Sequence, residues 1–427
     1  MKDRKQAEII IVGSGAGGAT LAKELSEQKR RVIVVEKGAR VGKIGTVKAA
    51  FSFYDKHGLL KSEEGITLYR TIMVGGTTVV SCGNGVRCLQ EELSGLGINL
   101  KKEFTEAERE LNVAPLNKER IIGGSRKIME AAQKMGYRME PMPKFSELRK
   151  CTSCGNCVLG CIFNAKWTAI DYLDQAIANG SSLITQTEIT EVLISDGKAK
   201  GVKGIGPNGP IEIMGDIIVI AAGGLATPII LQKSGVAGAG KKLFCDLFNI
   251  TYGAVENIGQ IREITMAVVD KEFYKSKGFI LSPFIDNLIS FILATGGRFL
   301  FGRLPWKKNL GIMTKIRDES KGKVTIDGKI EKSVTVRDRK KLEEGAAMSR
   351  EILIKAGAKP KSIFTTRPRG AHPGGTAAIG EVVNTNLETE VKNLFVCDAS
   401  VLPIAPGLPP ILTIVALAKW LSKRLLS

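Results

Sequence analysis

Residues 8–36 have the sequence EIIIVGSGAGGATLAKELSEQKRRVIVVE. The apolar runs 8–12 and 31–35 are each short enough to be a buried parallel strand. The spacing of the apolar residues in 20–28 predicts a helix between them. A strand, a helix and a second strand in this order form a βαβ unit, so this stretch predicts an α/β fold.

The turn between the first strand and the helix has the pattern G-x-G-x-x-G. Gly13 permits the tight turn, Gly15 lets the backbone approach a pyrophosphate, and Gly18 lets the helix pack closely on the strand. The free N–H groups at the helix start would face the phosphates. Glu36, 18 residues after Gly18, is placed to accept hydrogen bonds from a ribose. The pattern predicts a dinucleotide site; the alternative is a glycine turn that serves only packing.

The composition of the 427 residues narrows the class of protein. No apolar run reaches the roughly 18 residues that a membrane-spanning helix needs, and the basic start leads into the glycine turn instead of a signal-peptide core. We therefore expect a cytoplasmic protein. The net charge of +19 fits an acidic protein partner, an anionic membrane surface, an anionic substrate or simply a lysine-rich proteome. The lysines are scattered and not interleaved with aromatic residues, so we expect no nucleic-acid binding.

Later segments indicate two structural units. Residues 217–222 form another buried strand that ends at Gly223-Gly224, as expected where a nucleotide fold re-enters its own sheet. Residues 241–370 have alternating strand patterns and a helix that Gly357 ends. The predicted fold is therefore a Rossmann-like domain with a parallel sheet, into which an antiparallel-sheet α+β substrate domain is inserted. The expected boundaries are 1–100, 166–240 and 371–427 for the dinucleotide domain, 101–150 for a helical connection, 151–165 for a cysteine loop and 241–370 for the substrate domain.

Four cysteines, Cys151, Cys154, Cys157 and Cys161, have the spacing C-x2-C-x2-C-x3-C. Four thiolates this close together can surround a [4Fe–4S] cluster, and ferredoxins use the same spacing. Ile162 stands where ferredoxins usually have proline. A three-iron cluster, a zinc site and a purely structural loop remain the alternatives.

The chain has only two histidines. His372 lies in the turn AHPGGT and is the candidate base, because oxidation of an alcohol requires a group that takes the hydroxyl proton. His57 lies in the polar loop YDKHG and is expected at the surface. The apolar segment 279–301 is expected to be a wall of the substrate pocket or a patch that contacts a membrane peripherally.

These motifs together resemble the glucose–methanol–choline (GMC) family of FAD-dependent oxidoreductases. The order and spacing fit over nearly the whole chain and are weakest in 241–365. The matching segments are GSGAGGATLAKEL (13–25), VGGTTVVSCGNGVR (74–87), CTSCGNCVLGCIFNAKWTA (151–169), IIVIAAGGLATPIILQKSG (217–235), HPGGTAAIG (372–380) and NLFVCDASVLPIAPGLPPILTIVALA (393–418).

The resemblance implies that the dinucleotide is FAD and that His372 is the active-site histidine. The residues that it implies along the cofactor are Gly13, Gly15, Ala16, Gly17, Gly18, Glu36, Gly75, Gly76, Thr77, Ile189, Ala222, Gly223, Asp398, Leu412 and Thr413.

The chain departs from the family pattern at two positions. The family usually has Asn or His as a second polar group before the last helix, and here that position is Pro409. Ser81 also stands where the family often has Asn. The site would then work with His372 alone or recruit another group such as Asn84.

The sequence favours a dehydrogenase that oxidises an alcohol (CH–OH) group of a small molecule, for which a hydrophobic molecule is one candidate. It would pass electrons through the cluster to a ferredoxin, a cytochrome or a quinone. One alternative is a reductase that runs in the opposite direction onto a ketone or C=C bond of a lipid or isoprenoid. The other is an electron-transfer module without a substrate pocket. The oligomeric state stays open.

Overall fold

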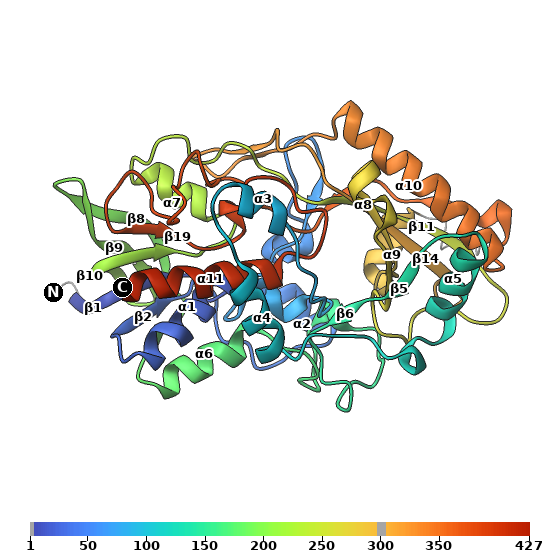
Figure 1. Ribbon diagram of the computed structural model, residues 1–427, viewed down its shortest axis with the longest axis horizontal. Helices are drawn as coiled ribbons and strands as arrows, with labels where there is room; N and C mark the ends of the chain where they lie inside the picture. Colours follow the sequence, from blue (N-terminus) through green and yellow to red (C-terminus); the bar gives the residue numbers. More distant parts are fainter. Residues whose placement is uncertain (1–3, 297–304) are drawn as a thin grey trace.

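The computed structural model describes residues 4–296 and 305–427. In Figure 1 two sheets lie side by side along the long axis of the molecule, and the C-terminus lies beside the first sheet. The last part of the apolar segment 279–301 lies outside the described residues.

The first sheet is built around the strand that precedes the glycine turn. Ile9, Ile10 and Ile11 of this strand are fully buried, and the strand has parallel neighbours on both sides. The sheet order is β7 (Ser182–Ile184), β2 (Val32–Val35), β1 (Arg4–Val12), β10 (Gly209–Ile220), β9 (Lys198–Gly206) and β8 (Glu188–Ser195), with β19 (Leu394–Val396) parallel to β10. The β10–β9–β8 pairs are antiparallel and the others are parallel.

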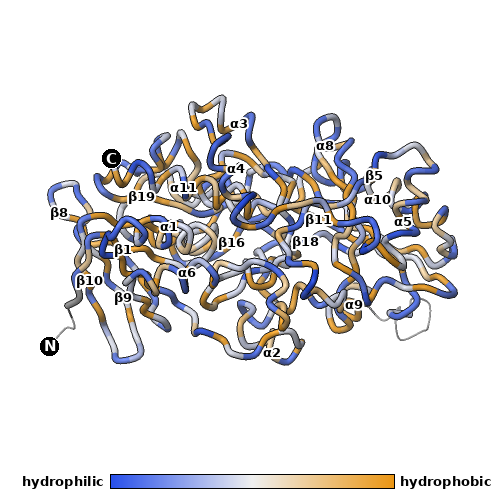
Figure 2. The backbone as a smooth tube through the Cα atoms, turned by 60° about the horizontal axis from the view of Figure 1, so that its bottom comes forward, coloured by the Kyte–Doolittle hydropathy of each residue, from blue (hydrophilic) through white to orange (hydrophobic). Residues whose placement is uncertain are grey.

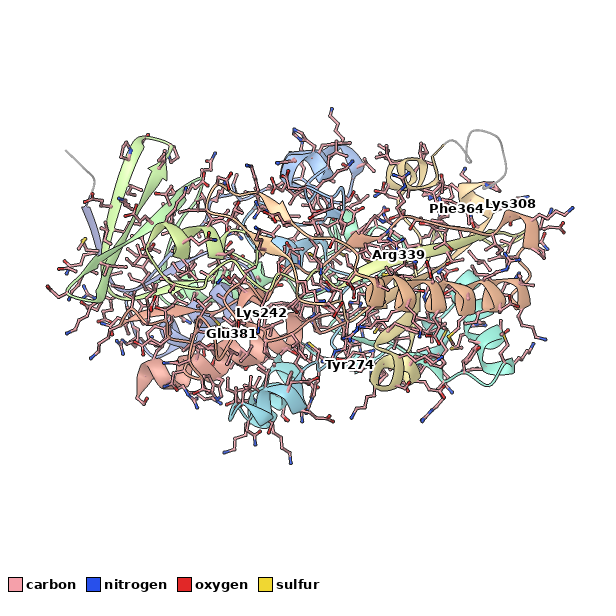
Figure 3. The ribbon with its side chains drawn as sticks, turned by 90° about the horizontal axis from the view of Figure 1, so that it is seen from above. Lys242, Tyr274, Lys308, Arg339, Phe364 and Glu381 are labelled. Carbon is pink, nitrogen blue, oxygen red and sulfur yellow. The ribbon has the colours of Figure 1, made fainter. Side chains whose placement is uncertain are left out.

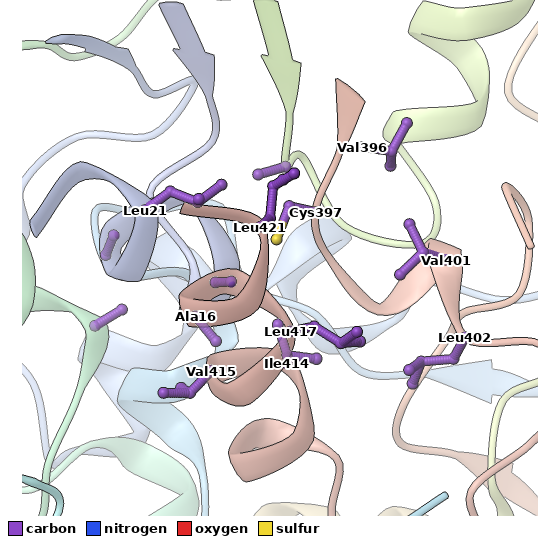
Figure 4. Close-up of a cluster of buried hydrophobic side chains, with 14 of the residues drawn as sticks. Ala16, Leu21, Val396, Cys397, Val401, Leu402, Ile414, Val415, Leu417 and Leu421 are labelled. Atoms are coloured by element: carbon purple, nitrogen blue, oxygen red, sulfur yellow. The ribbon is translucent and has the colours of Figure 1, made fainter. Parts of the chain in front are cut away.

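Helix α1 (Ala16–Glu27) packs against α6 (Ala169–Ala178) and the last helix, α11 (Ile411–Leu426). Figure 4 shows Ala16 and Leu21 of α1 in one cluster with Leu417 and Leu421 of α11 and with Cys397. The last helix therefore belongs to the core of the first unit, which is the part of the protein built around the first sheet. It does so although it is far from α1 in the sequence.

The second sheet has the order β3 (Thr67–Leu68), β18 (Arg369–Gly370), β11 (Leu247–Ala254), β14 (Asn309–Ile316), β13 (Phe279–Pro283), β12 (Val268–Asp270) and β5 (Met139–Pro141), with β17 (Phe364–Thr365) on β11. It is antiparallel except for the β3–β18 pair. The predicted fold class is therefore confirmed. Two of these strands, β3 and β5, come from outside residues 241–370, and the expected domain boundaries stay predictions.

Helix α10 (Val336–Lys355) covers the second sheet and packs on β11 and β14 (Figure 1). Thr335 and Asp338 begin it with a capping box. Gly345 allows the close approach, because a Cβ there would lie 2.2 Å from Thr314 Cγ2. The face of β14 that carries Thr314 is thereby fixed against the helix.

The remaining helices are α2 (Val47–Phe53), α3 (Gln90–Gly95), α4 (Lys101–Glu110), α5 (Gly123–Lys134), α7 (Thr227–Lys233), α8 (Glu272–Lys277) and α9 (Leu288–Thr295). None of the helices in the described ranges is long and apolar enough to cross a membrane.

Side-chain contacts join distant segments around the two sheets (Figure 3). The Tyr274 hydroxyl on α8 donates a hydrogen bond to the Pro406 carbonyl at 2.8 Å, so the second unit contacts the segment that leads into α11. Lys242 and Glu381 form an exposed ion pair and lie side by side in Figure 3. The exposed ion pair adds little stability.

Candidate active site

A cavity of about 1260 Å³ lies between the two sheets. Its wall includes the glycine turn and α1 from the first unit, and residues of β11, β14 and α9 from the second. Most of the residues predicted along the cofactor line it: Gly13, Gly15, Ala16, Gly17, Glu36, Gly76, Thr77, Ile189, Ala222, Gly223 and Asp398. The candidate base His372 lines the same cavity.

The glycine turn has the shape of a phosphate cradle. Gly13 has φ +107°, and a Cβ there would lie 2.2 Å from the Ala221 carbonyl oxygen. A Cβ on Gly18 would lie 2.0 Å from the Gly13 carbonyl oxygen. A Cβ on Gly15, in contrast, would meet no atom within 4 Å. Gly13 and Gly18 are therefore needed for packing, whereas Gly15 borders open space at the start of α1, where no side chain caps the helix N–H groups.

The carboxylate of Glu36 holds the glycine turn in place by hydrogen bonds. Its Oε2 accepts hydrogen bonds from the N–H (3.0 Å) and the hydroxyl (2.7 Å) of Ser14, and its Oε1 accepts one from the Gly38 N–H at 2.8 Å. Burial raises the pKa of Glu36, and these hydrogen bonds oppose the rise. The Ser14 hydroxyl in turn accepts a hydrogen bond from the Gly75 N–H at 3.0 Å. Glu36 thus holds two cavity segments together; its contact with a ribose stays a prediction.

The Gly75-Gly76 turn approaches the first glycine turn closely. Gly75 and Gly76 have φ values of +86° and +53°, and a Cβ on Gly76 would lie 3.3 Å from Gly15 Cα. Gly76 and Thr77 line the cavity, whereas Gly75 lies behind it and bonds to Ser14. The lack of a side chain at Gly76 therefore lets the two glycine turns approach each other closely.

His372 is held by Asp246 at the opposite end of the cavity. His372 Nδ1 lies 2.9 Å from Asp246 Oδ2, and Asp246 Oδ1 accepts a hydrogen bond from the Gly407 N–H at 2.7 Å. A carboxylate only accepts hydrogen bonds, so Nδ1 carries the proton and Nε2 has a free lone pair. Asp246 is fully buried.

The electrostatics keep His372 neutral. Burial, followed by the positive charge of Lys315, lowers the pKa of His372 well below its ordinary value. Burial raises the pKa of Asp246, while Lys315 and the Gly407 N–H oppose the rise. A neutral imidazole with a free lone pair is the form that a general base requires.

Lys315 is a third polar residue of this end of the cavity, and sequence reasoning missed it together with Asp246. Lys315 lies in β14, is 1% exposed, lines the cavity, and its Nζ is 3.5 Å from His372 Nδ1. Its signal in the sequence is a lysine inside the strand NLGIMTKI, whose residues are all buried. No pattern in the sequence around Asp246 indicated that this residue belongs to the site.

The comparisons with known proteins identify the family. The GMC oxidoreductase N-terminal family model matches residues 7–259, and the C-terminal model matches residues 318–418. The chain belongs to the GMC oxidoreductase family.

Several relatives of this GMC protein extend over most of its length. An uncharacterized protein of Methanocaldococcus jannaschii is 32% identical and covers 98% of this chain and 100% of the relative. A long-chain-alcohol oxidase of Arabidopsis thaliana is 24% identical over 99% of this chain and 68% of its own length. Pyridoxine 4-oxidase from "Mesorbium loti" has the same fold, with a TM-score of 0.72, 16% identity, and coverage of 98% of this chain and 99% of that chain. A formate oxidase variant of Aspergillus oryzae has a TM-score of 0.75, 16% identity, and coverage of 99% and 98%.

As in the GMC family, the cofactor is FAD, and the cavity fits it. The open space at Gly15 and the uncapped start of α1 suit a pyrophosphate. Asp398 shapes the neighbouring wall, because its carboxylate accepts hydrogen bonds from the Gly223 N–H (2.8 Å) and the Thr227 hydroxyl (2.5 Å). When bound, FAD supplies the hydride acceptor of the reaction.

Four of the predicted cofactor residues, Gly18, Gly75, Leu412 and Thr413, are not part of the cavity wall. Leu412 and Thr413 are fully buried, and the wall is formed instead by their neighbours Ile411 and Ile414. The Thr413 hydroxyl donates to the Cys88 carbonyl at 2.9 Å and accepts from the Cys88 N–H at 3.1 Å. Thr413 therefore anchors the start of α11 to the core.

Asn84 lines the cavity but already has partners at both ends. Its Oδ1 accepts a hydrogen bond from Lys144 Nζ at 2.6 Å, and its Nδ2 lies 3.2 Å from Met266 Sδ. Pro409 also lines the cavity. Asn84 is thus held as part of the wall, which weakens its case as the second polar group of this GMC site.

The structure does not show the metal cluster predicted for the four-cysteine loop. Within the described ranges, no three His, Cys, Asp or Glu side chains are placed to hold a metal ion. Cys154 is exposed, whereas Cys151, Cys157 and Cys161 are partly buried, and the Cys161 Sγ accepts a hydrogen bond from the Ala165 N–H at 3.3 Å. The short helix Cys157–Leu159 nevertheless borders the cavity, because Val158 and Leu159 line it.

Proposed function

We propose that this GMC protein oxidises the hydroxyl group of an alcohol and that His372 is the base that takes the hydroxyl proton. The observation that carries the proposal is the hydrogen bond between His372 Nδ1 and the buried Asp246, at a cavity that also contains the FAD cradle. Since Nδ1 is engaged, the free Nε2 is the atom that accepts the proton. The imidazolium that forms is stabilised by the adjacent carboxylate.

The walls of the cavity support an alcohol with a long apolar chain as the substrate. Ile289 and Leu293 of α9, and Phe51 and Leu59 near α2, line the cavity and are also exposed, Leu293 by 66% and Leu59 by 56%. Figures 2 and 3 both show α2 and α9 along the same edge of the molecule. Apolar side chains that are exposed at a cavity mouth favour a substrate that is itself poorly soluble, and they suit peripheral contact with a membrane from which it is taken. The name of the Arabidopsis relative, a long-chain-alcohol oxidase, agrees with this substrate class.

The test is anaerobic bleaching of the bound flavin by 1-butanol, 1-decanol and 1-hexadecanol in detergent. We expect bleaching that becomes faster with chain length. The His372→Ala variant should retain FAD but lose about 10²- to 10⁴-fold in bleaching rate, the range for loss of a general base. An unaltered rate in this variant would refute the assignment of His372.

A variant of the cavity mouth tests the substrate class separately. Leu293→Asp should weaken binding of 1-hexadecanol and leave that of 1-butanol unchanged, because only the longer chain reaches the exposed residues. Co-sedimentation with anionic phospholipid vesicles checks the membrane contact, which the same substitution should weaken. Equal effects on both alcohols would argue against an apolar path through α9.

We also propose that the electrons leave to an external carrier, so that the enzyme is a dehydrogenase. The support is the cysteine spacing at 151–161, the contact of its loop with the cavity, and the net charge of +19, which suits an acidic carrier.

The electron acceptor is tested by two measurements on anaerobically purified protein. Metal analysis should give about four iron atoms per chain if a [4Fe–4S] cluster assembles on the loop. Reoxidation of the reduced flavin should be slow with O2 and fast with ferredoxin, a cytochrome or a quinone. Fast reoxidation by O2 in protein without iron would make the enzyme an oxidase. If no alcohol bleaches the flavin but reduced ferredoxin does, and an enone then reoxidises it, the enzyme is a reductase.

A further inference from the structure

Lys315 differs from the other buried lysines near the cavity in what its ammonium contacts. Lys144 donates hydrogen bonds to the Cys82 and Thr265 carbonyls and to Asn84 Oδ1, and Lys166 donates to the Val79 carbonyl at 2.7 Å. Each of these ammonium groups therefore has acceptors that compensate for its burial.

The Lys315 ammonium has no such acceptor. Within the described part of the chain, His372 Nδ1 at 3.5 Å is the atom that lies within hydrogen-bonding distance of its Nζ. That nitrogen already carries a proton for Asp246, so it accepts no hydrogen bond from Lys315. A buried ammonium without an acceptor is costly, and the free space next to it is the cavity.

The strand register directs Lys315 toward the cavity. Side chains two residues apart lie on the same face of a strand, and Met313 and Lys315 both line the cavity. Phe248, which is opposite Lys315 on β11, also lines it. Thr314 between them faces Gly345 of α10. The ammonium is therefore presented at the wall that carries the candidate base.

We propose that Lys315 is the second polar group of the active site, the role left open by Pro409, and that its ammonium binds the hydroxyl oxygen of the substrate. This inference rests on the proposed alcohol oxidation. In that reaction the O–H bond breaks and the proton goes to His372 Nε2, while the C–H bonding pair leaves as hydride to FAD and the carbon becomes a carbonyl. Lys315 keeps its protons and stabilises the negative charge that develops on the oxygen.

Burial and the neighbours of Lys315 act on its pKa in opposite directions. Burial lowers the pKa of Lys315, and the negative charge of Asp246 opposes this. The titratable groups that act on the Lys315–His372–Asp246 cluster are Cys82, Cys88, Arg317 and Lys332 in addition to its own members.

The test compares Lys315→Met with Lys315→Arg, with rates expressed per bound flavin. In the Met variant we expect the limiting rate of anaerobic flavin reduction by 1-decanol to fall about 10²- to 10³-fold, as for loss of one donor to a developing oxyanion. The concentration of alcohol at half-maximal rate should change less than threefold. The limiting rate of the Arg variant should be at least tenfold higher than that of the Met variant. If Lys315→Met does not bind FAD, Lys315→Gln takes its place in the comparison with the Arg variant.

A second readout does not depend on turnover. The pKa of His372, followed by ¹⁵N NMR, should rise in Lys315→Met because a nearby positive charge is removed. A Met variant within threefold of the wild-type rate, or an unchanged pKa of His372, would overturn the role of Lys315 while leaving the proposed function intact. Failure of the proposed function is recognised separately, by a fully active His372→Ala variant.

Discussion

Replacement of Asp246 by asparagine should invert the tautomer of His372. The Asp246 carboxylate accepts two hydrogen bonds, one from the Gly407 N–H and one from His372 Nδ1–H. Asparagine has one acceptor oxygen. With that oxygen toward Gly407, the amide NH2 faces Nδ1, which must then give up its proton to Nε2. A protonated Nε2 cannot take the hydroxyl proton of a substrate.

The size of the effect follows from the hydrogen bond that is lost. A hydrogen bond to a charged group contributes about 1.5–3 kcal/mol, and each 1.36 kcal/mol is a factor of ten. The rate of flavin reduction by an alcohol should therefore fall about 10- to 150-fold. The fall should not exceed that of His372→Ala, which removes the base altogether.

The two histidines make the tautomer directly measurable. Long-range ¹H–¹⁵N spectra of protein labelled at histidine should show two imidazoles. His57 is an internal reference, because its Nδ1 lies 2.7 Å from the Phe51 carbonyl, which only accepts hydrogen bonds. In the wild type both rings should carry the proton on Nδ1, and in Asp246→Asn only His372 should change. A His372 ring that keeps its Nδ1 proton in the variant, or a rate within threefold of the wild type, would refute the reasoning.

Three further predictions test other parts of the cavity. Gly15→Ala should melt at the wild-type temperature but bind FAD more weakly, because its methyl group enters the space for the pyrophosphate; Gly13→Ala, with φ +107°, should instead lose stability in the same melting experiment. Arg369→Gln should lower the free energy of unfolding in urea by about 3–5 kcal/mol, because Asp286, 2.9 Å away, becomes a buried unpaired charge; a loss below about 1 kcal/mol would show that the pair adds little. Burial raises the pKa of Asp246 to about 7, so the rate of flavin reduction should rise with pH through 7 as the carboxylate forms, and an identical profile in Asp246→Asn would contradict this assignment.

The first unit was predictable because its function imposes local rules on the sequence. The close contacts of Gly13 and Gly18 leave no room for a side chain, so the glycines appear at a fixed spacing. The buried β1 reads as an uninterrupted apolar run because it has parallel neighbours on both sides. Each feature arises within a few residues of chain, where a pattern can show it.

The other end of the site could not be predicted in the same way. Asp246 and Lys315 reach His372 only because β11 and β14 are neighbours in a sheet, and no local pattern encodes that pairing. The cysteine loop shows the opposite case, in which a local pattern is present but does not determine the arrangement of the side chains. Its spacing is compatible with a cluster, but spacing does not determine where each side chain points, and Cys154 is exposed.

The contact between Asp246 and His372 is built by the backbone at the junction of the two units. The Cys245 carbonyl accepts hydrogen bonds from the N–H groups of both Ala371 and His372, at 2.9 and 3.0 Å. This pairing brings together two segments that are 126 residues apart. Asp246, the next residue, has φ +47°, a left-handed conformation that aspartate tolerates better than most residues. The conformation costs about 1–3 kcal/mol, and the surrounding hydrogen bonds hold it. Strain at the residue that fixes the tautomer of the candidate base is expected where a site is preorganised for proton transfer, and it explains why the pair lies where β11 begins and β18 ends.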